Sequence, residues 1–476
     1  MSPFSVHSHN RASHVCEKTT RYEPDDASRE GVGRGCIGTL FADRDVMHAR
    51  LCVPWLLAAT FVATACGDSL SSVPPKSSPS PTPTSTPTPE PTARGVFVYV
   101  ANPDAKTVSG FSVGRSTGAL TPLASSPTTL PGKPVALAID GQARFAHVGL
   151  RGSPDALATY SIDGQTGALT AVPSSGLASP RFSLEPGYSS CSAEHPILSS
   201  IVGHPSGRFV YVTFDGDECI CGVDAWILTY AVDSATGRLT QLDLPSRGVG
   251  KAGHGDVRPF GLSAVSVVSG PYLYATNRGV SRGGAEACDV SSLLAGFSVD
   301  PGSGELRRLG GTPFAEGSPN GGDGHLRLAL KPQGDFLYLA RQHDTVQFKP
   351  DSATGTLAQR GSSPLIGPAA FSPAGRLYSA ASSGGVSGLQ VFEIQPGNGS
   401  LLPKPDAFSA TQGAVSAIAI DSSGRFLYAV QSESGVVSAF AIDAATGRLQ
   451  PGVPTVVGTE SVTSPDFRVI AIANVP

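Results

Sequence analysis

The chain has 476 residues, of which 40% are hydrophobic and only 15% charged, and its formal net charge is −4. It contains 56 glycines and 40 prolines but only 2 methionines, a composition that favours short strands and tight turns over long helices. Because it has no run of Lys or Arg, it lacks the positive surface that binds a phosphate backbone, and we expect no nucleic-acid partner.

Residues 47–65 have the pattern of a signal peptide. The uncharged stretch at 51–65 follows Arg50 and ends in small residues, as the apolar region and cleavage site of an export signal do, and it is too short to span a bilayer. Residues 1–46 are polar and unpatterned. We therefore expect residues 1–46 to be either a mis-assigned start, with Met47 as the true first residue, or a disordered extension.

Cleavage before Cys66 would leave a cysteine at the mature N-terminus, where bacterial lipoproteins carry their acyl chains. The Ala-Thr-Ala at 63–65 resembles a lipobox but also suits ordinary signal peptidase. We expect an exported protein of the bacterial cell envelope, lipid-anchored to a membrane through Cys66 and facing the periplasm or the outside. Residues 66–94 include a Pro/Ser/Thr tract, which predicts an extended tether.

A hairpin motif, typified by DAATGRL, returns seven times within residues 95–476, and its Gly supplies the positive φ of a tight turn. The copies end at Leu120, Leu169, Leu239, Leu306, Leu357, Leu401 and Leu449. A second motif, a turn followed by an aromatic-rich strand as in GRFLYAV, occurs six times between residues 139 and 430. Seven hairpins predict seven structural units in one domain.

The two ends of this domain complement each other. The strand at 96–102 (VFVYVAN) has no partner strand before it, and the strand at 468–474 (RVIAIAN) has none after it. Pairing them completes one unit, closes a ring and removes the exposed sheet edges of a linear array. We predict an all-β fold, a seven-bladed β-propeller of four-stranded blades closed by its C-terminal strand, and we expect a monomer.

The long insertions all fall on one face of the predicted ring. In blades with strands A to D, the A-to-B and C-to-D turns lie on one face, which we call the short-turn face. The B-to-C and D-to-A connections lie on the other, which we call the loop face. The insertions lie in the B-to-C and D-to-A connections, at 173–196, 214–225, 243–261, 277–292 and 310–325. We therefore expect ligands to bind on the loop face.

Four cysteines lie in these insertions, at Cys191, Cys219, Cys221 and Cys288. In an exported protein two disulfides are the plain expectation. Since Cys219 and Cys221 are too close to favour bonding each other, each would pair with Cys191 or Cys288. A four-thiolate zinc site is the alternative, but neither Cys191 nor Cys288 has a second ligand at zinc spacing beside it, and we assign no metal.

The insertions also carry the polar residues from which a site could be built. These are His195, Asp215, Asp217, Glu218, His254, Arg258, Arg278, His325, Arg341 and His343. Together such residues could bind an anion or activate water, although each one taken singly is more often a solvated loop residue. The acidic run at 214–218, with Asp224, could bind calcium but lacks the full spacing of a calcium loop. No other cofactor is indicated.

The repeat text, GRFLYAV with VSAFAIDAATGRL, resembles the β-propeller lactonase family of 6-phosphogluconolactonase-like, YVTN-type repeat proteins over about residues 95–476. The resemblance implies that LYATNRG at 273–279 presents Arg278 to a substrate carboxylate or phosphate. It also implies an acidic strand end at Asp215 and Asp217. Where the family has a histidine opening an inner strand, this chain has Ser199, with His195 and His204 nearby.

Two functions follow from these observations. The first is a cell-envelope module that binds a ligand or an envelope protein partner on its loop face. The alternative is a lactonase, a carboxylic-ester hydrolase that opens a sugar or carboxylic-acid lactone. In that case His195 or His254 would activate water, and Arg258 with Arg278 would hold the substrate carboxylate and stabilise the developing oxyanion.

Overall fold

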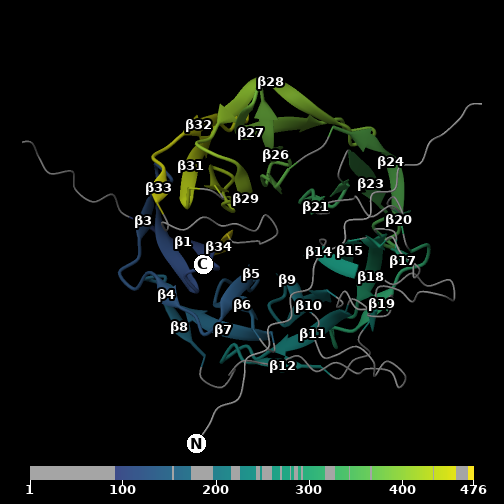
Figure 1. Cartoon of the computed structure of the whole chain (residues 1–476), viewed down its shortest axis with the longest axis horizontal. Coiled ribbons are helices and arrows are strands. Elements are labelled where there is room, and N and C mark those ends of the chain that lie inside the picture. The colour runs from purple at the N-terminus through teal and green to yellow at the C-terminus, as the bar shows by residue number, and fades with distance from the viewer. Residues whose placement is uncertain are drawn as a thin grey trace, which may run out of the picture. The chain divides into compact units, whose positions relative to one another are not determined.

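The short alternating segments of the sequence form β-strands that are grouped into blades (Figure 1). The computed structural model describes residues 92–152, 155–172, 197–215, 226–242, 247–248, 260–267, 271–278, 280–282, 288–290, 293–312, 314–316, 327–341, 344–364, 367–431, 434–456 and 470–475. All belong to one compact unit, residues 83–476. Over these ranges every regular element is a strand, and the strands form seven sheets of four or five strands and one two-stranded hairpin.

Each large sheet is one blade, whose strands follow the order A to D. Blade 1 contains β34 (Ile470–Asn474), β1 (Thr92–Asn102), β2 (Thr107–Gly114) and β3 (Leu120–Pro122). Blade 2 contains β5 (Lys133–Ile139), β6 (Phe145–Arg151), β7 (Ala156–Ile162) and β8 (Leu169–Ala171). Blade 3 contains β9 (Ile197–Gly203), β10 (Phe209–Asp215), β11 (Trp226–Val232) and β12 (Leu239–Gln241).

The other four blades follow the same plan. Blade 4 contains β14 (Phe260–Val267), β15 (Tyr272–Arg278), β18 (Leu293–Val299) and β19 (Leu306–Arg308). Blade 5 contains β21 (Arg327–Leu330), β22 (Leu337–Ala340), β23 (Thr345–Pro350) and β24 (Leu357–Ser363). Blade 6 contains β25 (Ala369–Phe371), β26 (Leu377–Ser383), β27 (Val386–Ile394) and β28 (Leu401–Ala410). Blade 7 contains β29 (Val415–Ile420), β30 (Phe426–Gln431), β31 (Val436–Ile442) and β32 (Leu449–Pro451).

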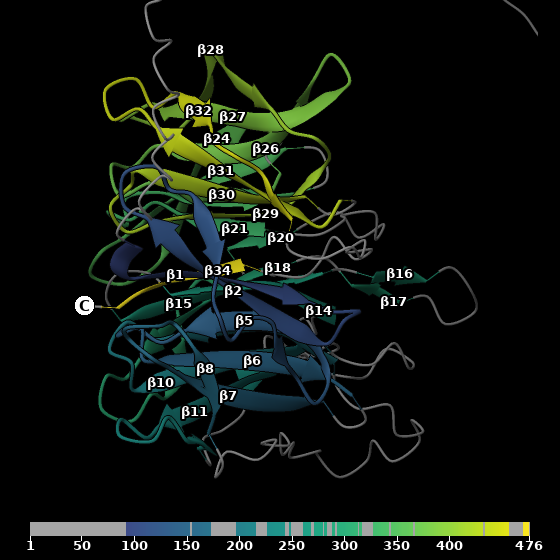
Figure 2. The same cartoon turned by 90° about the vertical axis from the view of Figure 1, so that its left-hand side faces the viewer.

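Several short strands are additions that the sequence pattern does not predict. In blades 1, 3, 4 and 7 a two-residue strand follows strand D in the chain and also pairs with strand C. These strands are β4 (Thr128–Thr129), β13 (Arg247–Gly248), β20 (Ala315–Glu316) and β33 (Thr455–Val456). The hairpin of β16 (Val280–Arg282) and β17 (Cys288–Val290) lies between strands B and C of blade 4, on the loop face (Figure 2). Strands this short show no alternation from which to predict them.

The ring closes as the sequence predicts. Strand β1 pairs with β34 in antiparallel register from Val96 opposite Asn474 to Val100 opposite Ile470. Strand β34 also contacts β29 and β5, the A strands of blades 7 and 2. The first and last strands of the ring therefore share one sheet, with β1 and β34 side by side in Figure 1. The seven-bladed fold with four-stranded blades and its C-terminal closure are confirmed.

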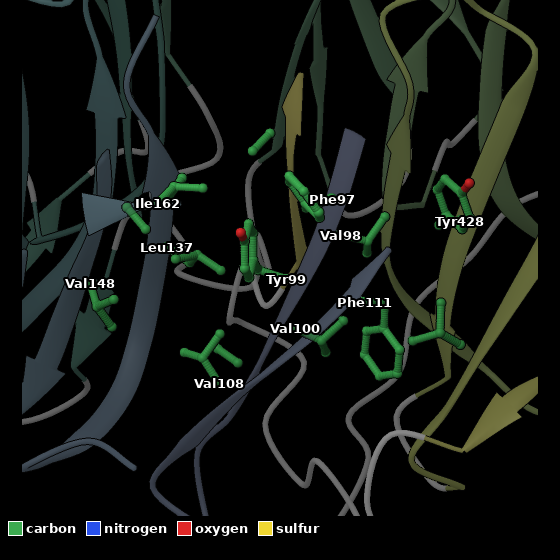
Figure 3. Close-up of a cluster of buried hydrophobic side chains, with 14 of the residues drawn as sticks. Phe97, Val98, Tyr99, Val100, Val108, Phe111, Leu137, Val148, Ile162 and Tyr428 are labelled. Carbon is green, nitrogen blue, oxygen red and sulfur yellow. The ribbon is translucent and has the colours of Figure 1, made fainter. Parts of the chain in front are cut away.

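The apolar core lies between neighbouring blades. Figure 3 shows one such cluster, in which Phe97, Val98 and Tyr99 of β1 meet Leu137 of blade 2 and Tyr428 of blade 7. A blade packs against each side of strand B, and β6, β22 and β30 are therefore buried along all or nearly all of their length.

A repeated side-chain contact joins one blade to the next. A tyrosine of strand B donates its hydroxyl hydrogen to the carbonyl of the glycine in the following blade's C-to-D hairpin, and we call this contact the tyrosine clasp. The clasps are Tyr99 to Gly167, Tyr211 to Gly304, Tyr274 to Gly355, Tyr338 to Gly399, Tyr378 to Gly447 and Tyr428 to Gly118, at 2.6–3.4 Å. The last one spans the closure of the ring. The two sequence motifs thus recur together because they contact each other.

Blade 2 departs from this pattern. His147 occupies the clasp position and is completely buried. Its Nδ1 lies 3.1 Å from Thr159 Oγ1, on the strand opposite. Its Nε2 has no hydrogen-bond partner among the described residues, because the imidazole ring is shorter than a phenol. The junction between blades 2 and 3 is therefore held by other contacts.

Replacing Gly118 by alanine is expected to destabilise the ring closure by about 3 kcal/mol. Gly118 has a φ of +69°, and an added Cβ would lie 2.3 Å from the ring of Phe426. The left-handed backbone costs about 1 kcal/mol and the overpacking about 2. Urea unfolding measures the loss, with Gly310→Ala as the control because no atom lies within 4 Å of the Cβ added there. Equal unfolding midpoints for the two variants would contradict this account.

Candidate functional site

Two of the predicted site residues end strands at the loop face of adjacent blades. Asp215 is the last residue of β10 and pairs with Ile197, the first residue of β9. Arg278 is the last residue of β15 and pairs with Phe260, the first residue of β14. Strand β14 contacts both β9 and β10. The backbones of these two residues therefore reach the same face at neighbouring blades, while their side chains lie outside the described part of the chain.

Most of the other predicted site residues lie outside the described residues. These are Cys66, Cys191, His195, Asp217, Glu218, Cys219, Cys221, Asp224, His254, Arg258, His325 and His343. For Cys288 only the backbone is described, at the start of β17. The disulfide, calcium and catalytic assignments that rest on these residues remain predictions.

Ser199 stands on β9 at an irregularity in its pairing with β10, between Thr213 and Phe214. Its hydroxyl donates to the backbone carbonyl of Thr213 at 3.2 Å and lies 2.9 Å from Thr213 Oγ1. The two side chains form a hydroxyl pair two residues before the end of β10 at Asp215. The sequence points to Ser199 only through the family position that it occupies, and Thr213 carries no signal before the strands are paired. Thr213 is completely buried and its Oγ1 lies 3.4 Å from the Ser200 carbonyl oxygen, so these hydroxyl hydrogens are used within blade 3 and the pair fixes the start of β9 against β10.

His204, near Ser199 in sequence, is not part of this face. It lies in the A-to-B turn of blade 3, on the short-turn face, with Nδ1 2.7 Å from Ser206 Oγ. Partial burial, and then the charge of Arg208, lower the pKa of His204.

Two loop-face cations are held by carboxylates. Arg341 donates from Nε and Nη2 to the two carboxylate oxygens of Asp344, at 2.8 and 2.7 Å. Lys133, at the start of β5, lies 2.9 Å from the Asp104 carboxylate in the B-to-C connection of blade 1. Because these pairs offset their own charge, they attract an anion less strongly than an uncompensated arginine would.

The short-turn face carries a repeated structural acid. In five C-to-D hairpins an aspartate accepts hydrogen bonds from the backbone and the side chain three residues later, which lowers its pKa; these are Asp163, Asp233, Asp300, Asp351 and Asp443. A lowered carboxyl pKa here marks a capped turn and not a reactive group. Because the aspartates of the short-turn face serve to cap turns, we look for the site on the loop face.

Within the described ranges, no group of three or more His, Cys, Asp or Glu is placed to hold a metal ion. Among the same residues, no helix has the length and apolar character needed to cross a membrane.

A family model described as a lactonase with a seven-bladed β-propeller matches residues 201–372 and 369–464. A candidate 6-phosphogluconolactonase from Bacteroides uniformis is 18% identical, with 80% of this chain and 100% of that chain covered and a TM-score of 0.55. The periplasmic gluconolactonase of Pseudomonas aeruginosa is also 18% identical, with 80% and 99% covered and a TM-score of 0.54. No curated protein matches the chain significantly. At this identity the structural likeness shows the fold.

Proposed function

Because the chain belongs to the family of seven-bladed β-propeller lactonases, we propose that it hydrolyses a lactone on its loop face. The match to the family over residues 201–464 is the observation that carries this proposal. It includes blades 3 and 4, where the strands bearing Asp215 and Arg278 end side by side on that face. The strand ends that flank the predicted insertions lie on the same face.

The reaction needs few groups. A base removes a proton from water, and the water oxygen adds to the lactone carbonyl carbon. The ring C–O bond then breaks, and the protonated base returns the proton to the leaving ring oxygen, which gives a hydroxy acid. We assign the base to His195 or His254. Arg258 and Arg278 would stabilise the oxyanion and hold an acidic group of the substrate. Asp215 and Asp217 would accept hydrogen bonds from sugar hydroxyls.

The substrate that we propose is a sugar lactone outside the cytoplasm. Two structural relatives are described as acting on gluconolactones, one of them in the periplasm. The signal-like residues 47–65 and the cysteine at position 66 support export and attachment to a membrane by a lipid. The tether at 66–94 would let the domain reach soluble substrates.

A second proposal, that the loop face binds a ligand or an envelope protein without turnover, rests on one residue. Ser199 occupies the family's histidine position, and a serine hydroxyl is not a base near neutral pH. This proposal requires saturable binding without hydrolysis.

We expect the purified protein to hydrolyse D-glucono-1,5-lactone or its 6-phosphate faster than the spontaneous reaction. Arg278→Gln is expected to lower kcat/KM by about 100-fold through lost oxyanion stabilisation. His195→Ala or His254→Ala should cost about 100-fold or more through loss of the base. His204→Ala, on the short-turn face, is the control and should keep full activity. Product acid is followed by pH-stat titration. Binding of either lactone without turnover would favour the binding module.

A further inference from the structure

The junction of blades 2 and 3 lacks a tyrosine clasp, yet its loop-face end is held by a distinct set of contacts. Gly149 on β6 leaves space for the Leu198 side chain, since a Cβ added to Gly149 would lie 2.4 Å from a Leu198 methyl group. Leu198 is itself completely buried. A side chain of blade 3 therefore fits into the surface of blade 2 where the inner strand β9 begins.

The backbone of Leu198 is held by side chains from blade 2. Asp155, in the B-to-C connection of that blade, accepts the Leu198 amide hydrogen on Oδ2 at 2.7 Å. Its Oδ1 accepts the amide hydrogen of Gly152 at 2.9 Å. Arg151, at the end of β6, lies with Nη2 3.4 Å from the Leu198 carbonyl oxygen. Side chains of blade 2 thus bind both the amide and the carbonyl of Leu198.

Asp155 is only 5% exposed, which sets it apart from Asp104 and Asp344, the carboxylates described in the other loop-face connections. The carboxylates of Asp104 and Asp344 pair with cationic side chains, whereas that of Asp155 accepts two backbone amide hydrogens. Burying a carboxylate is unfavourable unless such hydrogen bonds compensate, and each of them has a fixed direction. The bonds therefore determine where β9 starts relative to blade 2.

The position of Leu198 determines that of its neighbours. Ile197, before it, pairs with Asp215 across the sheet. Ser199, after it, carries the hydroxyl that bonds to Thr213. The Leu198 amide that Asp155 binds therefore lies one residue from Ser199 and one residue from Ile197, the backbone partner of Asp215.

We propose that Asp155 is a positioning residue for the loop-face site: by binding the Leu198 amide it holds the start of β9, and with it Ser199 and the end of β10, in the geometry that the ligand requires. This role rests on the proposed lactone hydrolysis. Asp155 itself does not touch the substrate. Its effect is transmitted through the backbone of one residue, so it should alter turnover without altering the chemistry of any reacting group.

The chain offers a matched control in Asp421. That carboxylate is also 5% exposed and accepts two backbone amide hydrogens, from Arg425 at 2.9 Å and Phe426 at 2.8 Å, but in the A-to-B turn of blade 7 on the short-turn face. Asp155→Ala and Asp421→Ala each remove one buried and one partly buried backbone hydrogen bond. Asp421 also accepts the Ser423 hydroxyl hydrogen, so Asp421→Ala should lower the unfolding midpoint at least as much as Asp155→Ala does, while disturbing the other face.

The experiment compares the full-length protein with both alanine variants and with Asp155→Asn, which keeps one acceptor oxygen. Turnover of D-glucono-1,5-lactone, thermal unfolding and amide hydrogen exchange are measured on each. We expect Asp155→Ala to lower kcat/KM by about 100-fold, as a small misplacement of binding groups does, with a smaller loss in Asp155→Asn. Exchange at Leu198 should accelerate in Asp155→Ala alone. Asp421→Ala should keep wild-type kcat/KM.

Equal kcat/KM for the two alanine variants would overturn the positioning role while leaving the lactonase proposal intact. Unchanged exchange at Leu198 in Asp155→Ala would overturn it as well, since the carboxylate would then not hold that amide. Absence of turnover by the unmodified protein would overturn the proposed function first, and with it the role of Asp155 in that site.

Discussion

A chain that ends at residue 469 is expected to lose the cooperative unfolding transition of the intact protein. The deletion removes β34, strand A of blade 1, which pairs with β1 and contacts the A strands of both neighbouring blades. Without it β1 presents a free edge and the ring is open between blades 7 and 1. Because a native domain is stable by only about 5–15 kcal/mol, losing one inner strand is enough to abolish folding. Thermal unfolding followed by circular dichroism measures the loss.

A substitution tests the same closure without shortening the chain. Ala473 is completely buried opposite Phe97, so Ala473→Asp would place a carboxylate without a partner in the core. This is expected to cost about 4 kcal/mol or more. Ala444→Asp is the control, since Ala444 is exposed in the C-to-D hairpin of blade 7. A melting temperature for Ala473→Asp equal to that of this control would show that β34 does not close the ring in solution.

The second large effect is expected from His147 and depends on pH. Burial lowers the pKa of this histidine from 6.5 to about 4, although the charge of Asp140 opposes the shift. Between these two pH values the unfolded chain binds a proton that the native protein does not. Stability therefore falls as the pH falls through this window, by about 3 kcal/mol in total. His147→Tyr removes this acid-dependent loss.

Tyrosine should also fit at this position. In blade 3 the clasp residue Tyr211 lies opposite Thr229, just as His147 lies opposite Thr159. A hydroxyl that reaches the Gly237 carbonyl would add about 1 kcal/mol. Urea unfolding at pH 7, 5.5 and 4.5 compares the wild type, His147→Tyr and His204→Gln. His204 also has a lowered pKa but is only partly buried, so its replacement should remove a smaller part of the acid-dependent loss. Parallel losses of stability in the wild type and His147→Tyr would show that His147 is not the acid-sensitive group.

The repeat pattern predicts the fold almost completely because each blade is built from the same turns and strands. A glycine hairpin and an aromatic strand recur seven and six times in the sequence, and in the structure they meet across blade boundaries. The unmatched strands at the two ends predict the closure, which the pairing of β1 with β34 confirms. The pattern does not show which hairpin each tyrosine contacts, because that partner belongs to the next blade.

The candidate site is less predictable for a physical reason. A site on a propeller is assembled from strand ends and connections of different blades, which share no sequence period. Arg278 and Asp215 can be identified from motifs at strand ends, whereas Thr213 and Asp155 have no such signal. The role of Asp155 can be inferred only from the structure, in which its carboxylate accepts the amide hydrogen of Leu198, 43 residues away.

The sequence by itself determined the number of blades, the plan of each blade, the place where the ring is cut and the face that carries the insertions, because these follow from local turn chemistry and strand alternation repeated along the chain. Only the tertiary structure decided that Tyr428 closes the ring onto Gly118, that His147 leaves one junction without a clasp, and that Asp155 holds the start of β9. Each of these depends on how one blade packs against the next, and only the closed ring brings those residues together.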